Sequence, residues 1–335
     1  MAGVTTFFSR KLIDGKHLSK FSKSVRLLLH DGKVASRSMS TDLDLSGIYP
    51  PIPTPFKANE DVDWHSLKSN LDKWSAVPFK GYVVQGSNGE YVSLSTEEKI
   101  DMVQFVAENV ESNKTILVGS GCEGTKETIE LTNEMAKKGA HAALVVTPAF
   151  FKNRMNSAAM INHYTQVADA SSIPVILYNV PSNTGFEFPV DAIIKLSEHP
   201  NIIGFKDSGG NITNIGHIIS ETRERGFQVL AGGASFLMAS MNLGAVGGIC
   251  ALANILGQEC CDLATLCKEG RLDEARELQL KLIAPNQAVT RKYNVPALKY
   301  AMDLCGYYGG PSRSPLGPLN EQEMKDVKNC FKEYC

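Results

Sequence analysis

The sequence lacks the features that mark membrane proteins and nucleic-acid-binding proteins. No apolar run approaches the roughly 18 uninterrupted residues that suggest a membrane span. The formal net charge is only −2, so the bulk charge calls for neither nucleic acid nor an anionic surface as a partner. Hydrophobic residues make up 43% and charged residues 21%, the ordinary balance of a globular domain. We therefore expect an ordinary globular protein.

The sequence also lacks the patterns of a metal, disulfide or dinucleotide site. The seven histidines are scattered, and no pair has metal-ligand spacing at the end of a predicted strand, so we predict no metal. The eight cysteines contain no C-x-x-C pair, and a chain this long needs no disulfide framework, so we predict free, mostly buried thiols. Residues 119–124 match G-x-G-x-x-G, but the next predicted strand ends without the required acid, so we predict a tight loop and no cofactor.

Acidic residues are scarce in one segment, residues 1–40. This segment holds eight Lys and Arg, two acids and seven serines, whereas the rest of the chain holds 26 Lys and Arg and 34 Asp and Glu. A basic, serine-rich, acid-poor leader is typical of an organelle transit peptide. A disordered basic tail is the alternative. No long apolar segment suggests a secretory signal.

From residue 47 onward, short apolar runs alternate with helical stretches. The runs are 47–52, 81–85, 115–119, 142–147, 174–179, 202–206, 228–231 and 244–250. Strands that alternate with helices imply parallel pairing, and eight such units favour a (β/α)8 TIM barrel over an open, doubly wound sheet. Past residue 254 the pattern is helical only. We predict one domain over 45–335, with a C-terminal helical extension over about 271–335.

Chemically useful side chains end three of these runs. Lys206 is the only cation in an apolar run, where loss of solvation favours the neutral amine that a Schiff-base nucleophile needs. Tyr178 ends the preceding run and is a candidate general acid and base. Ser87 and Asn88 lie between two glycines, in a turn that can bind a carboxylate. Taken singly, each has an ordinary alternative: a lysine that reaches water, a core aromatic or a plain loop.

The segments 86–90, 178–181 and 204–208 resemble, in order and spacing, the three signatures of the dihydrodipicolinate synthase / N-acetylneuraminate lyase family. The resemblance covers about residue 45 to the C-terminus. It implies a class I aldolase in which Lys206 forms an imine with a 2-oxo acid, Tyr178 transfers protons, and Ser87 and Asn88 hold the substrate carboxylate. It further implies substrate contacts for Ser208 and Gly232, no metal, and a homotetramer.

Within that family, the segments 47–51, 84–90 and 306–311 and the basic leader most resemble the mitochondrial 4-hydroxy-2-oxoglutarate aldolases. This implies a matrix enzyme of hydroxyproline degradation that cleaves 4-hydroxy-2-oxoglutarate to pyruvate and glyoxylate. Two alternatives stay open. One is another pyruvate-dependent lyase of the family, acting on sialic acid or a 2-keto-3-deoxy sugar acid. The other is a catalytically silent barrel that binds a 2-oxo acid.

Two positions depart from the family pattern. Asn183 occupies the position where synthases that use aspartate semialdehyde carry a carboxylate-binding arginine, which argues against that activity. Phe150 follows the Thr-Pro of the fourth run, where many members carry a tyrosine that enters the neighbouring subunit's site. Phenylalanine cannot relay a proton. Two outcomes stay open: the proton path runs through Tyr178, Ser87 and water, or the rate is lower.

Overall fold

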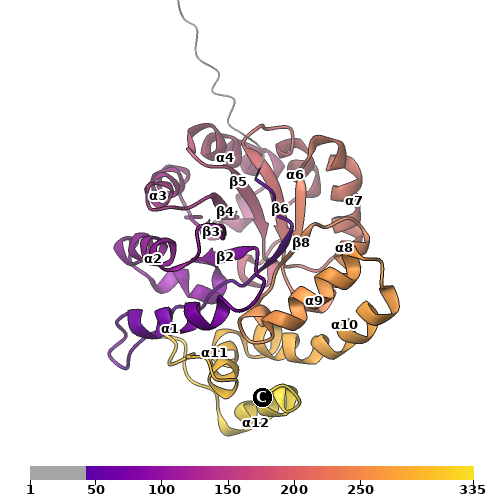
Figure 1. Cartoon of the computed structure of the whole chain (residues 1–335). Coiled ribbons are helices and arrows are strands. Elements are labelled where there is room, and N and C mark those ends of the chain that lie inside the picture. The colour runs from indigo at the N-terminus through magenta and orange to yellow at the C-terminus, as the bar shows by residue number, and fades with distance from the viewer. Residues whose placement is uncertain (1–42) are drawn as a thin grey trace, which may run out of the picture. The chain divides into compact units, whose positions relative to one another are not determined.

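A computed structural model describes residues 43–335, which form eight parallel strands with helices between them (Figure 1). The strands are β1 (Gly47–Tyr49), β2 (Gly81–Val84), β3 (Thr115–Gly119), β4 (Ala142–Val146), β5 (Val175–Asn179), β6 (Ile202–Asp207), β7 (Gln228–Ala231) and β8 (Gly247–Ile249). The helices are α1 (Trp64–Trp74), α2 (Thr96–Asn109), α3 (Thr125–Lys137), α4 (Ser157–Ala170), α5 (Pro181–Thr184), α6 (Val190–Leu196), α7 (Ile212–Thr222), α8 (Leu237–Asn242), α9 (Gly257–Lys268), α10 (Leu272–Gln287), α11 (Asn294–Leu304) and α12 (Glu321–Phe331). The leader predicted over 1–40 lies outside the described residues.

The sheet closes on itself, as the prediction of a TIM barrel requires. Strand order runs β1-β8-β7-β6-β5-β4-β3-β2, and each neighbouring pair is parallel. Backbone hydrogen bonds join the two ends: Lys80 N donates to Ile48 O at 3.1 Å, and Val83 N donates to Pro50 O at 3.0 Å. The strand β1 is shorter than predicted because Pro50 and Pro51 follow it, and proline has no amide hydrogen for the ladder.

Side chains on β5 and β6 alternate between the barrel interior and the helical layer. Ile176 and Tyr178 pack inside the barrel, whereas Val175 and Leu177 pack against the helices. An irregularity in the pairing of β5 with β6 follows Val175. Beyond it, the register pairs Tyr178 with Lys206. Neighbouring strands thus bring together the two residues that the sequence predicts as a catalytic pair.

Side chains cap the first turns of α2 and α4. Ser95 caps α2 in a capping box: its hydroxyl accepts from Glu98 N, and the Glu98 carboxylate accepts from Ser95 N. Asn156 caps α4, and its side-chain oxygen accepts from Ala159 N. Both caps satisfy amide hydrogens that have no partner inside the helix.

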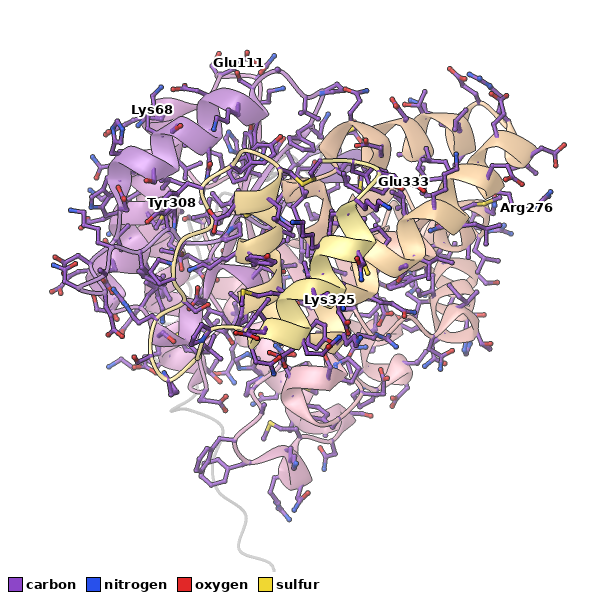
Figure 2. All side chains as sticks on the ribbon, turned by 90° about the horizontal axis from the view of Figure 1, so that it is seen from below. Lys68, Glu111, Arg276, Tyr308, Lys325 and Glu333 are labelled. Carbon is purple, nitrogen blue, oxygen red and sulfur yellow. A yellow bond between two sulfur atoms is a disulfide. The ribbon has the colours of Figure 1, made fainter. Side chains whose placement is uncertain are left out.

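The C-terminal helices continue past the barrel and return to its N-terminal half. Figure 2, a view from below, shows the yellow C-terminal segment in front of the rest of the chain, with Tyr308 next to the purple N-terminal part. Tyr308 N donates to Asn70 Oδ1 of α1, and Asn70 Nδ2 donates to Tyr308 O, both at 2.8 Å. Lys299, inside α11, pairs with Glu90 in the loop after β2 at 2.5 Å, and both side chains are buried. The extension therefore contacts the loop that was predicted to bind substrate.

The prediction that all cysteines are free is wrong for two of them. Cys305, after α11, and Cys335, the last residue, form a disulfide, and the other six thiols are free. The packing of α12 against α11 brings these positions together over 30 residues, and no sequence spacing reveals such a contact. Among residues 43–335, no helix combines the length and the apolar character needed to cross a membrane.

Candidate active site

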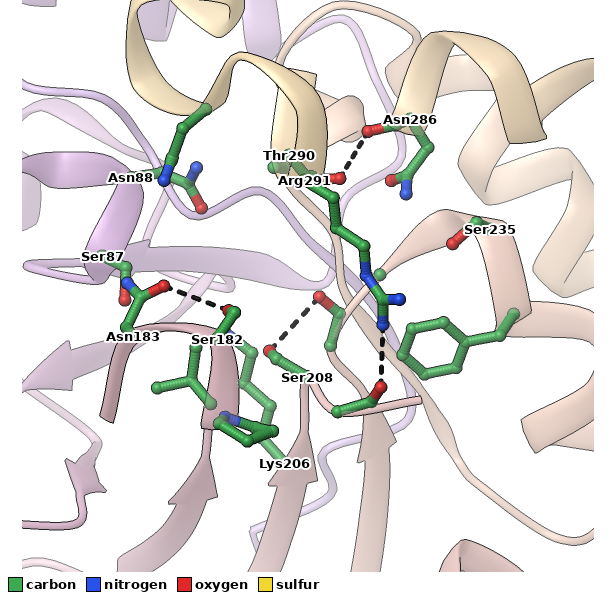
Figure 3. A pocket seen from close by; sticks show the side chains of 18 of the residues that line it. Ser87, Asn88, Ser182, Asn183, Lys206, Ser208, Ser235, Asn286, Thr290 and Arg291 are labelled. Carbon is green, nitrogen blue, oxygen red and sulfur yellow. Dashed lines mark hydrogen bonds between the residues drawn. The ribbon is translucent and has the colours of Figure 1, made fainter. Parts of the chain in front are cut away.

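One cavity of about 530 Å³ lies at the carboxyl ends of the strands, where the residues of a TIM-barrel active site converge (Figure 3). All six residues predicted from the sequence line it: Ser87, Asn88, Tyr178, Lys206, Ser208 and Gly232. They come from the ends of β2, β5, β6 and β7. The geometry therefore brings together the whole set that sequence reasoning proposed.

Lys206 is buried, with 3% of its surface exposed, and its side chain reaches the same cavity as Tyr178. Its Nζ lies 4.0 Å from the centre of the Tyr178 ring. No carboxylate among residues 43–335 forms an ion pair with it. An amine without an acidic partner, in a buried cavity, is suited to attack a carbonyl.

Tyr178 is held between Lys206 and the loop after β2. Its hydroxyl lies 3.3 Å from Ser87 Oγ. Burial raises the pKa of the phenol, but the charge of Lys206 and hydrogen bonds from Ser87, Ser208 and Lys206 outweigh it, so the pKa lies below its ordinary value. A phenol that loses its proton more readily is a better general base near neutral pH.

The loop that carries Ser87 and Asn88 is a short 3-10 turn with strained ends. Gln85 has φ 67° and Glu90 has φ 55°, in the left-handed region that side chains rarely adopt. Thr54 Oγ1 donates to Gly89 O at 2.6 Å, and the buried Lys299 holds the Glu90 carboxylate. These contacts fix the loop in place against its own backbone strain.

Ser208 and Gly232 meet at the floor of the cavity. A Cβ atom on Gly232 would lie 2.2 Å from Ser208 Oγ and 2.4 Å from Asp207 O, so only glycine fits. Gly232 N donates to Asp207 O at 2.6 Å, which joins the ends of β6 and β7. This close approach keeps the backbone of Gly232 exposed as part of the cavity wall.

Behind the catalytic pair lies a polar cluster that the sequence analysis missed. Asn179 Nδ2 donates to Asp207 Oδ1 at 2.7 Å and to Glu187 Oε2 at 2.8 Å, and Gly210 N donates to Asp207 Oδ2 at 2.6 Å. Burial raises the pKa of the Asp207 carboxyl above its ordinary value. Asn179 and Asp207 each follow a site residue by one position. Their position directly after a predicted site residue was the clue in the sequence that could have identified them.

The mouth of the cavity holds a second cation, Arg291, which the sequence analysis also missed. It lies in a π-helical segment, Ala288–Lys292, that follows α10, and its Nη2 donates to Gly209 O at 2.8 Å. Figure 3 shows its side chain reaching down from the C-terminal helices toward the strand ends. Among the residues that the structure describes, only Lys206 and Arg291 bring a charge to the lining of this cavity. Arg291 lies in a C-terminal helical segment and not at the end of a strand, so the pattern of residues at the strand ends does not reveal it.

Phe150 does not line the cavity of its own subunit. It is 78% exposed, and its ring packs edge-on against Phe151, also exposed. The carboxylate of Glu123 accepts hydrogen bonds from Ala149 N and Phe150 N, which fixes this loop. Phe150 therefore contributes nothing to the cavity that Lys206 and Tyr178 line.

Comparison with known proteins agrees with this geometry. The family model for the dihydrodipicolinate synthetase family matches residues 44–334. A 4-hydroxy-tetrahydrodipicolinate synthase of Methanothrix thermoacetophila is 34% identical over 84% of this chain and 95% of its own, and one of Methanococcoides burtonii is 32% identical over 86% and 97%. The dihydrodipicolinate synthase of Acinetobacter baumannii, solved in complex with pyruvate, is 30% identical with a TM-score of 0.83, over 87% of this chain and 99% of that one.

Proposed function

Because the chain belongs to the dihydrodipicolinate synthetase family, we propose that it is the aldolase that cleaves 4-hydroxy-2-oxoglutarate to pyruvate and glyoxylate. The family consists of pyruvate-dependent Schiff-base aldolases that use a lysine and no metal. Among residues 43–335, no cluster of side chains is suited to hold a metal ion. The finer assignment depends on one observation: a second cation, Arg291, lines the cavity that also holds Lys206 and the loop with Ser87 and Asn88.

The reaction begins when the Lys206 amine attacks the C2 carbonyl of the substrate and water leaves, giving a protonated imine. Ser87 and Asn88 line the cavity beside this position and are suited to bind the adjacent C1 carboxylate. The positively charged imine then accepts electrons from the C3–C4 bond. Covalent attachment thus replaces one difficult step with easier ones.

Cleavage requires a base for the hydroxyl on C4. The Tyr178 phenol, with its lowered pKa, is placed to take that proton as the C3–C4 bond breaks and glyoxylate leaves. The enamine that remains is protonated on C3, and water then releases pyruvate and free Lys206. The Ser87 hydroxyl, 3.3 Å from the Tyr178 oxygen, continues the path for the proton.

Arg291 matches the second carboxylate of a dicarboxylic substrate. A 2-oxo acid with one carboxylate needs only the loop at Ser87 and Asn88, whereas 4-hydroxy-2-oxoglutarate carries a second carboxylate on C5. Guanidinium groups bind carboxylates in a planar, two-point geometry. Asn183 and Thr290 line the same mouth and add neutral hydrogen-bonding groups.

Two other activities of the family compete with this proposal. The relatives named above are synthases, which favours condensation of pyruvate with aspartate semialdehyde, but Asn183 stands here in place of the arginine described for that reaction. The second competing activity is the cleavage of sialic acid or of a 2-keto-3-deoxy sugar acid. A silent barrel is disfavoured because Lys206, Tyr178 and Ser87 all meet in one cavity.

Turnover of three substrates separates these activities: 4-hydroxy-2-oxoglutarate, pyruvate with aspartate semialdehyde, and N-acetylneuraminate. We expect the highest kcat/KM with 4-hydroxy-2-oxoglutarate. The Arg291→Gln variant should raise its KM by roughly ten- to a hundredfold, the loss expected for a charged hydrogen bond. The control Arg276→Gln, on the exposed face of α10, should leave KM unchanged. A higher kcat/KM with either other reaction, or an Arg291→Gln variant with the parent's KM, would contradict the assignment.

The location and assembly of the protein form part of the same proposal. We expect residues 1–40 to direct the chain to the mitochondrial matrix, since the segment is basic and poor in acids. Fusion of residues 1–40 to a fluorescent protein tests this, and a diffuse cytosolic signal would contradict it. We also expect a homotetramer, although one related structure is described as a monomeric variant. Light scattering of the purified chain measures the assembly.

A further inference from the structure

A second, much smaller cavity lies beside Tyr178. Its volume is about 10 Å³, at the lower limit of what is needed to hold a single water molecule. Its polar side chains are Gln85, Ser87, Tyr91 and Tyr178, and its other lining residues are Gly86, Gly119, Gly121, Leu144 and Val146. Two residues of the catalytic site, Ser87 and Tyr178, therefore line both this cavity and the large one.

Gln85 provides an independent sign that this cavity holds a ligand. Its side chain is 98% buried, and neither its Nε2 nor its Oε1 has a hydrogen-bond partner among the described residues. An unpaired buried amide costs about 1–3 kcal/mol, so such groups are nearly always bonded to protein or to ordered water. Gln85 also adopts φ 67°, a strained conformation that the neighbouring structure must enforce.

Tyr91 connects this cavity with the protein surface. It lines the small cavity and also a groove of about 450 Å³ between α2 and α3. Lys99 and Glu123 line that groove, along with Glu127, Glu130 and Glu134. Burial, together with the nearby Tyr178 and Glu123, raises the pKa of the Tyr91 phenol to about 12. Tyr91 therefore stays protonated near neutral pH. It can relay a proton by giving one and accepting another, but it does not act as the catalytic base.

We propose that a water molecule held by Gln85 links the Tyr178–Ser87 pair to Tyr91, and that this chain of groups is the route by which protons leave the active site. The proposal rests on the proposed Schiff-base chemistry at Lys206. A proton taken from the substrate enters at the Tyr178 oxygen, and one proton leaves from Tyr91 to the groove. In reverse, the same route brings in the proton that C3 of the enamine takes up, so cleavage is proton-neutral overall. Ser87, the water and Tyr91 each accept one proton and give one, so Tyr178 regains its basic form. The route lies within one subunit and needs no hydroxyl at position 150.

The exchange of pyruvate's methyl hydrogens for deuterium tests this route without any aldol substrate. Formation of the enamine from the pyruvate imine removes a C3 hydrogen, and NMR in D2O follows its replacement. We expect Tyr91→Phe and Gln85→Met to slow this exchange by roughly ten- to a hundredfold, within the range of acid–base contributions. Borohydride trapping of pyruvate should be unchanged in both. Tyr82→Phe, which removes the hydroxyl of a buried tyrosine on β2 outside this cavity, is the control and should match the parent.

A double variant adds a readout that a merely structural defect would not give. If Gln85 and Tyr91 act in one route, the double variant should exchange no more slowly than the worse single variant. Exchange at the parent's rate in both single variants, with trapping intact, would overturn the route. A parent protein that is neither trapped by borohydride nor active in exchange would instead overturn the proposed function.

Discussion

Lys206 and Tyr178 depend on each other. The lysine charge lowers the pKa of the phenol, and the phenol ring lies 4.0 Å from the lysine Nζ. Their placement follows from the register of β5 with β6, which pairs the two residues directly. In the proposed mechanism, Lys206 forms the covalent bond and Tyr178 transfers the proton. Because two different side chains carry these roles, substitution of one residue can separate them.

Tyr178→Phe should separate them. Without the phenol, we expect kcat for cleavage to fall by about 10²- to 10⁴-fold, the usual contribution of a general base. Borohydride trapping with pyruvate should persist, because Lys206 remains. In the parent, the rise of kcat/KM with pH should occur below 10.0, the ordinary value for tyrosine, because the basic form is the active one and its pKa is lowered. Turnover within about twofold of the parent would contradict this role for Tyr178.

Sequence reasoning found the residues that end strands and missed those that do not. Lys206, Tyr178 and Ser87 could be predicted because a barrel brings strand ends together. Asn179 and Asp207 follow such residues directly, but their partner Glu187 lies in a loop. Arg291 reaches the site from the C-terminal helices, and its position depends on how that extension packs, which no local pattern in the sequence encodes.

Among the elements, the ion pair between Lys299 of α11 and Glu90 connects the C-terminal extension to the substrate loop. Each side chain is 1% exposed. Lys299 also lies 4.5 Å from the centre of the Phe56 ring and donates to Pro311 O at 2.7 Å. Burial lowers the pKa of this lysine despite Glu90, so the pair exists at a desolvation cost. We infer that the Lys299–Glu90 pair serves to hold the loop that carries Ser87 and Asn88 in position.

Lys299→Met should therefore leave the buried Glu90 carboxylate without its cation, with the Arg313 backbone N–H, at 2.9 Å from Glu90 Oε2, as its remaining hydrogen-bond donor. We expect the free energy of unfolding to fall by about 3–5 kcal/mol, measured by denaturant titration. We also expect weaker binding of pyruvate, because the loop loses its support. The control Lys292→Met removes an exposed pair with Asp326 at 2.8 Å and should cost no more than about 1 kcal/mol. Equal losses in the two variants would show that burial of the pair has no special importance.

The contact between α3 and α4 should make stability depend on pH. His163 of α4 is buried, and its Nδ1 lies 2.9 Å from Thr125 Oγ1. Burial lowers its pKa from 6.5 to about 4. The unfolded chain then binds a proton that the folded chain does not, so stability rises with pH between about 4 and 6.5. This histidine contributes up to about 3 kcal/mol across that window.

His163→Gln should flatten this dependence. Denaturant titrations at several pH values between 4 and 6.5 measure the slope, and His217→Gln on the exposed face of α7 serves as the control. The control should keep the parent's slope. If His163→Gln also keeps that slope, the acid sensitivity arises elsewhere in the molecule.

For the molecule as a whole, the fold was the most predictable property. The strands are buried on both sides, and the alternation of eight apolar runs with helices left few topologies possible. The closure of β1 against β2 confirmed the barrel over the open sheet. The Cys305–Cys335 disulfide was not predictable, because it depends on the packing of the last helix. Asn183 and Arg291, to which the proposed function assigns the choice of substrate, do not end strands: Asn183 lies in α5 and Arg291 in the π-helical segment after α10.

The central claim is that Lys206 forms an imine with a 2-oxo acid, and reduction of that imine tests it most directly. The full-length protein is incubated with pyruvate and sodium borohydride, and the modified peptide is identified by mass spectrometry. We predict a single pyruvyl adduct on the peptide that contains Lys206, loss of activity in proportion to labelling, and no adduct in Lys206→Ala. An unlabelled protein, or an adduct on another lysine such as Lys299, would contradict the claim.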